Sequence, residues 1–188
     1  MQQSDKITWL CAVIFPFLML LLIGNALVFD TALYNSLLRP GAVQPTMQVL
    51  DYFQGKGTVP DIFDAREKEH LTDVKQVISL LRWVSLVLLI VFLALITKAD
   101  TSKVFIRGFW ILVVLALLSG FIPFDTVFEK FHQTFFSDGS YLFPADSMLI
   151  IMYPVGFFQA FFSYIISMTL AYSAAVFLLG YIQQKQKA

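Results

Sequence analysis

The chain has 188 residues, of which 58% are hydrophobic and only 14% are charged. Soluble globular domains carry about 25% charged residues, so this composition is typical of a polytopic membrane protein. The net charge of zero argues against a nucleic-acid-binding protein, which needs a basic surface. Cys11 is the single cysteine, which excludes an intrachain disulfide and a cysteine-based metal cluster.

Four apolar stretches are long enough to cross a hydrocarbon core of about 30 Å. The expected spans are residues 9–29, 77–97, 104–122 and 158–182. We therefore expect an all-α membrane protein, with one integral membrane domain over residues 1–188. Two longer outer loops, about residues 30–76 and 123–157, should carry short interfacial helices. Residues 24–26 (GNA) imitate a small-x-small cleavage site, so a signal peptide is the alternative interpretation of the first stretch.

The first outer loop contains apolar residues at helical spacing. They predict a short interfacial helix over residues 46–53, which residues 55–57 (GKG) interrupt. Asp64 and Glu67 then resemble a capping box, with an acid in place of Ser or Thr. A helix should start there and run without a break to about Thr97.

In the second outer loop, Asp125 is expected to cap a short helix over residues 126–136. The apolar run over residues 148–181 is too long for one span. We expect residues 146–157 to dip into the interface, because Pro154 and Gly156 are natural helix breakers.

Charge sets the expected orientation. Residues 1–8, 98–107 and 183–188 share one side and hold six of the 13 Lys and Arg, although the opposite loops are about three times longer. The positive-inside rule places these short flanks, and both termini, in the cytoplasm. The two histidines, His70 and His132, then share the outer face.

Each histidine follows a glutamate by three positions, Glu67 or Glu129, and His70 also has Asp73 three residues on. On a helix such pairs share a face, so an acid can orient each ring and favour its imidazolium form. Three interpretations remain open: solvated interfacial histidines, a metal site, or an acid–base pair.

The doubled Glu-x-x-His is the motif of di-iron carboxylate bundles, but with three glutamates in the chain the further bridging acids are missing. A zinc ion bound by His70, His132 and one acid is the remaining metal site. Acid–base chemistry suits imidazole, whose pKa is about 6.5. The chain has no Gly-x-Ser-x-Gly motif, so direct attack by a substrate nucleophile fits better than a covalent serine mechanism.

Residues 67–75 (EKEHLTDVK), 131–136 (FHQTFF) and 141–146 (YLFPAD) resemble the signature stretches of the bacterial lipoprotein intramolecular transacylase family. The four-span layout and the length are similar too. A tryptophan is usual in that family where Tyr141 stands.

The resemblance implies an acyltransferase of the bacterial cytoplasmic membrane. Its partners would be diacylglyceryl-modified lipoproteins and membrane lipids, without a cofactor or bound metal. The α-amine of the lipoprotein's N-terminal cysteine would attack the sn-2 ester of its own lipid, giving the lyso form. The alternatives are a non-enzymatic sensor or assembly protein and a metal-dependent hydrolase.

The resemblance also implies roles for individual residues. His70 and His132 would be the catalytic pair. Aromatic side chains would line an acyl groove, unless they form an ordinary interfacial belt: Phe131, Phe135, Phe136 and Phe143. The remaining polar residues would support the site: Glu67, Glu69, Asp73, Lys75, Glu129, Tyr141 and Asp146.

Overall fold

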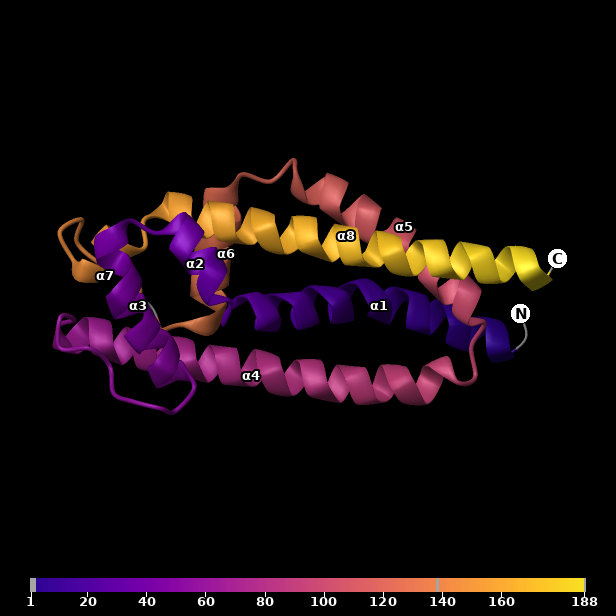
Figure 1. Cartoon of the computed structure of the whole chain (residues 1–188), viewed down its shortest axis with the longest axis horizontal. Coiled ribbons are helices and arrows are strands. Elements are labelled where there is room, and N and C mark those ends of the chain that lie inside the picture. The colour runs from indigo at the N-terminus through magenta and orange to yellow at the C-terminus, as the bar shows by residue number, and fades with distance from the viewer. Residues whose placement is uncertain (1–2, 138, 188) are drawn as a thin grey trace. The chain divides into compact units, whose positions relative to one another are not determined.

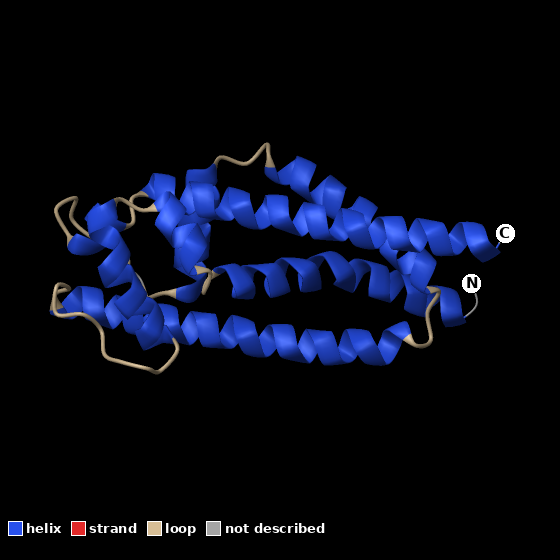
Figure 2. Cartoon of the chain, viewed as in Figure 1, coloured by secondary structure: helices blue, strands red, loops and turns tan. Residues whose placement is uncertain are grey.

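The computed structural model describes residues 3–137 and 139–187, and within them all regular structure is helical (Figure 2). The helices, labelled in Figure 1, are α1 (Gln3–Leu27), α2 (Thr31–Leu37), α3 (Pro40–Phe53), α4 (Ala65–Ile96), α5 (Thr101–Ser119), α6 (Phe124–Phe135), α7 (Met148–Met152) and α8 (Val155–Lys187).

Helices α1, α4, α5 and α8 are long and apolar enough to cross a membrane, which confirms the four predicted spans. The last helix differs in its bounds. It begins at Val155 rather than at residue 158, and it includes residues 183–187, which were expected to form a tail. The break falls at Pro154, which precedes α8, whereas Gly156 is the second residue of that helix.

The chain forms two compact units. The first contains the described residues of Met1–Asn25, Leu81–Ile122 and Tyr164–Ala188. Its core is a buried apolar cluster of Cys11, Phe15, Leu18, Phe92 and Val104. Many other large apolar side chains of these helices are exposed, Trp83 and Leu117 among them, as expected of surfaces that face lipid.

Close helix approach in this first unit depends on glycine. A Cβ atom on Gly108 of α5 would lie 2.7 Å from Cδ1 of Phe15 of α1, whose side chain is buried. Polar contacts add to this packing, since the Asn25 side-chain amide donates to Oγ of Ser85 at 2.7 Å. Such small residues and interhelical hydrogen bonds are the usual means of holding helices together in lipid.

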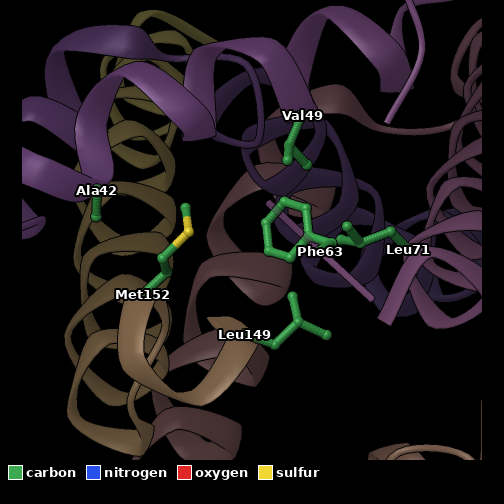
Figure 3. Close-up of a cluster of buried hydrophobic side chains, with 6 residues drawn as sticks. All are labelled: Ala42, Val49, Phe63, Leu71, Leu149 and Met152. Carbon is green, nitrogen blue, oxygen red and sulfur yellow. The ribbon is translucent and has the colours of Figure 1, made fainter. Parts of the chain in front are cut away.

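The second unit contains Ala26–Leu80 and Pro123–Ser163. Figure 3 shows its main core, in which side chains from α3, α4 and α7 meet Phe63 of the intervening loop: Ala42, Val49, Phe63, Leu71, Leu149 and Met152. The predicted interfacial helix over residues 46–53 is part of α3, which begins earlier, with Pro40 in its first turn. Helix α2 was not predicted. Asp30 caps it, accepting hydrogen bonds from the backbone N–H groups of Ala32 and Leu33.

The expected cap of α6 is wrong. Pro123 occupies the N-cap position and makes no side-chain hydrogen bond, while Asp125 lies inside the first turn. At that position its negative charge interacts favourably with the positive end of the helix dipole, but its side chain does not cap the first backbone N–H groups.

We expect Gly108→Leu to destabilise the first unit by about 1–3 kcal/mol, because the new side chain must displace a buried phenylalanine ring. Gly24→Leu is the matched control on α1, since a Cβ atom there has no heavy atom within 4 Å. Unfolding in detergent, followed by tryptophan fluorescence, measures both. Equal stability of the two variants would contradict the close packing at Gly108.

Candidate active site

His70 lies in the second turn of α4, and the start of that helix is fixed by the predicted capping box. Oδ1 of Asp64 accepts from the N–H of Glu67 at 2.8 Å, and Oε2 of Glu67 accepts from the N–H of Asp64 at 2.9 Å. The second carboxylate oxygen of Glu67 accepts from the N–H of Leu149 in α7 at 2.9 Å. Glu67 is only 2% exposed, and its two carboxylate oxygens accept from the backbone at the starts of α4 and α7, which fixes the beginning of the helix that carries His70.

His132 lies on α6, and its ring is held by its own helix. Nδ1 of His132 is 2.7 Å from the carbonyl oxygen of Phe128, one turn earlier. A carbonyl only accepts hydrogen bonds, so Nδ1 carries the proton and Nε2 of the neutral ring keeps a free lone pair.

The two imidazoles lie next to each other within the second unit. Their ring centroids are 6.4 Å apart, and their planes differ by 16°. Phe136 contacts both rings, at centroid distances of 4.8 Å from His70 and 5.4 Å from His132. The sequence predicted this meeting of two residues far apart in the chain.

Aromatic side chains surround the pair. Phe143 meets the ring of His70 edge-on at 5.3 Å, and Tyr141 lies 5.1 Å from the ring of His132. Phe131 also contacts His132, whereas Phe135 packs on Phe131 and is partly exposed. The enclosure leaves His132 buried, with 9% of its surface exposed.

Burial is the main cause of a lowered pKa at both histidines. Burial and, to a lesser extent, the neighbouring His132 together lower the pKa of His70 to about 4, against the opposing effect of Asp73. Burial also lowers the pKa of His132, against the hydrogen bond to Phe128. Asp73 raises the pKa of His70, as expected of a nearby acid, but desolvation outweighs its attraction. Both rings are neutral at neutral pH.

The other charged residues expected to support the site lie elsewhere. Nζ of Lys75 lies 4.0 Å from the ring centroid of Tyr52, and Glu129 accepts a hydrogen bond from Gln133 at 2.8 Å. Glu69 and Asp146 are exposed. A shared sequence spacing does not place these side chains against the imidazoles.

Sequence reasoning missed two contributors to the site. Phe128 packs on His132 at a centroid distance of 4.2 Å and binds it through its carbonyl. Arg66 donates to the carbonyl oxygens of Gly139 and Leu142, at 2.7 and 2.9 Å, and its guanidinium lies 5.3 Å from the ring centroid of Phe143. The four-residue spacing of Phe128 and His132 was a usable signal, whereas nothing in the sequence pointed to Arg66.

The site has one buried polar atom without a partner. Nδ1 of His70 makes no hydrogen bond within the part of the chain that the structure describes. Such an atom costs about 1–3 kcal/mol, which a substrate group can recover by bonding to it. Over the same residues, no three side chains of His, Cys, Asp or Glu come close enough to hold a metal ion.

The model of the family described as lipoprotein intramolecular transacylase Lit matches residues 9–158. The chain belongs to this family. The lipoprotein intramolecular transacylases are enzymes, so both the family and the enzymatic nature inferred from residues 67–75, 131–136 and 141–146 are confirmed.

Solved structures of the family share the fold. The chain is similar to the membrane integral transacylase Lit from Bacillus cereus, with 20% identity, a TM-score of 0.77 and coverage of 98% of this chain and 93% of that one. That structure carries a histidine-to-arginine mutation. A second structure gives 19% identity, a TM-score of 0.73 and coverage of 98% of both chains. A comparison with curated proteins found no match.

We expect the two histidines to make folding depend on pH. The pKa of His70 falls from about 6.5 in the unfolded chain to about 4 in the folded one, so the unfolded state binds more protons between these values. The stability from the neutral ring is present above about pH 6.5 and is lost as the pH falls towards 4. Nitrogen-15 NMR of histidine in the detergent-solubilised protein should find the ring of His70 neutral at pH 6. An imidazolium at His70 at that pH would contradict its desolvation.

Glu67→Gln should destabilise the protein by about 1–3 kcal/mol, because the amide of glutamine cannot accept from both backbone N–H groups. Glu69→Gln removes the same charge at an exposed position two residues away and should have little effect. Denaturant unfolding of both variants measures the difference. Equal loss in the two would mean that Glu67 contributes only its charge.

Proposed function

We propose that this protein moves the sn-2 acyl chain of a diacylglyceryl lipoprotein onto the α-amine of the lipoprotein's own N-terminal cysteine. The product is the lyso-form lipoprotein. The observation that carries the proposal is the pair of neighbouring imidazoles. His132 is buried and has a lone pair on Nε2, and His70 is half-buried, with an Nδ1 that has no hydrogen-bond partner within the described residues.

His132 is the better general base of the two. The carbonyl of Phe128 fixes its tautomer, so Nε2 always presents the lone pair. The α-amine of a peptide has a pKa of about 7.7–8.0 and is mostly protonated at pH 7. A base that takes a proton from this amine is therefore useful, as general base catalysis typically contributes 10²–10⁴-fold.

His70 then acts on the leaving group. With a pKa of about 4 it stays neutral, so it assists as a neutral N–H donor and not as an imidazolium. The new bond joins the amine nitrogen to the acyl carbon, and the bond from that carbon to the glycerol oxygen breaks. From the ammonium form, one proton is released to the solvent through His132 when the amine becomes neutral. A second proton leaves the nitrogen as the amide forms and ends on the glycerol oxygen, so the transfer consumes no water.

The surroundings favour transfer over hydrolysis. Phe136, Phe143 and Tyr141 enclose the rings and limit water near the ester. Because the amine and the ester belong to one molecule, holding them in an attack geometry supplies much of the rate.

Mass spectrometry of lipoprotein N-terminal peptides, from cells with and without this protein, tests the reaction. The product should have the mass of the diacylated substrate, with one acyl chain moved to the cysteine amine. His70→Ala and His132→Ala should each abolish the shift, and the double variant should be little worse, as for groups that act as a unit. Gln133→Ala, exposed on α6, is the control and should keep activity. A product heavier by one chain means transfer from another lipid, and a lighter one means a lipase; either result rejects the proposal.

We further propose that both termini face the cytoplasm and that the histidine pair lies on the extracytoplasmic side of the bacterial cytoplasmic membrane. The basic residues of the short flanks support this orientation.

A cysteine introduced at Gly57 should react with an impermeant thiol reagent added outside the cells, after permeabilisation of any outer membrane. One introduced at Thr101 should react only after the cytoplasmic membrane is opened. The native Cys11 is buried and should remain unlabelled in both. The reverse pattern would invert the topology.

A further inference from the structure

A pocket that the catalytic proposal does not use lies in the second unit, where α7 meets α8. Its volume is about 120 Å³. Leu37, Leu38, Met152 and Phe157 supply apolar side chains to its walls, and polar atoms make up about half of the lining surface. An engineered apolar cavity of about 150 Å³ binds benzene, so this pocket has room for several carbon atoms of an acyl chain. Neither histidine lines it.

The rim of the pocket carries one cation. Arg39 is exposed and is the only charged residue among the described lining residues. It occupies the N-cap position of α3 and makes no side-chain capping bond there. None of the ion pairs within residues 3–137 and 139–187 involves its guanidinium.

Two helices also begin at this rim. Helix α3 starts at Pro40, directly after Arg39, and α8 starts at Val155, beside the lining residues Pro154 and Gly156. The first backbone N–H groups of a helix have no intrahelical partner, and the helix dipole makes that end positive. The arginine and the two helix starts therefore favour an anion at the mouth of this pocket.

The position along the chain supplies the third observation. The helix that is apolar and long enough to cross the membrane begins at Val155. Pro154 and Gly156 therefore lie at the beginning of this span. Lipid phosphates occupy that depth, with acyl chains directly below it.

We propose that this pocket binds an anionic phospholipid of the surrounding membrane, with the phosphate on Arg39 and the start of an acyl chain among the apolar side chains of its walls. The charge distinguishes this ligand from the substrate of the proposed reaction, whose diacylglyceryl group carries no phosphate. The proposal is independent of the transacylase reaction, because it uses none of the residues assigned to that reaction.

Native mass spectrometry of the full-length protein in detergent tests the site, with phosphatidylglycerol and phosphatidylcholine of identical chains as probes. The wild type should retain phosphatidylglycerol at least about tenfold better, because its phosphate carries an uncompensated negative charge, whereas the choline cation of phosphatidylcholine offsets the phosphate charge and repels Arg39. Arg39→Gln should remove this preference. Gly156→Leu should reduce the binding of both lipids, because the new side chain enters a space where a Cβ atom has no neighbour within 4 Å.

Matched controls separate the pocket from general effects. Lys56→Gln removes another exposed cation, and Gly57→Leu adds a leucine at another open glycine; both should bind lipid as the wild type does. His70→Ala should also bind phosphatidylglycerol normally, even if it proves inactive.

Several outcomes would overturn the proposal. Equal retention of the two lipids, or an unchanged preference in Arg39→Gln, would show that Arg39 does not recognise the net charge of the headgroup. Displacement of phosphatidylglycerol by inorganic phosphate at the same concentration would show a phosphate site without a lipid tail. Displacement by a diacylglyceryl lipopeptide, more effectively than by phosphatidylglycerol itself, would assign the pocket to the substrate.

Discussion

One buried carboxylate organises the part of the molecule in which the histidines lie. Glu67 closes the first turn of α4 and, with its other oxygen, the first turn of α7. The negative charge sits where two helix dipoles are positive, which favours it at both ends. Because His70 is three residues further along the same helix, its position follows from this contact. The α7 residues Leu149 and Met152 are brought by the same contact into the core shown in Figure 3.

Burial then sets the chemistry of the pair. Two imidazoles in water would be partly protonated near neutral pH, and two cations this close would repel each other. The aromatic rings around them remove water and keep both neutral. The ring of His132 is bound to a backbone carbonyl, whereas Nδ1 of His70 has no hydrogen-bond partner within the residues that the structure describes. This difference gives two chemically similar residues different capacities.

Much of the fold could be predicted from the sequence, because its signals are local. Apolar runs indicate spans, and Asp64 with Glu67 indicates the start of α4. The shared membrane face of His70 and His132 required only an even number of crossings between them, whereas the contact of their rings depends on the packing of α4 and α6. The prediction for Asp125 failed because Pro123, two residues earlier, already takes the N-cap position. The contacts of Glu129 with Gln133 and of Lys75 with Tyr52 could not be predicted, since spacing gives a helix face but not the partner that each side chain finds on that face.

The contacts of Arg66 bear on how this loop can vary between relatives. Both of its acceptors are backbone carbonyls, of Gly139 and Leu142, so the anchorage does not depend on which side chains the loop carries. Gly139 itself has a φ of 76°, where glycine is favoured. Between these fixed points, the ring of Tyr141 lies 5.1 Å from that of His132, and another aromatic side chain at this position would leave the backbone anchorage unchanged. The loop thus keeps its course while the ring above the imidazole is exchanged, and the size of that ring becomes a variable that evolution can tune separately from the fold.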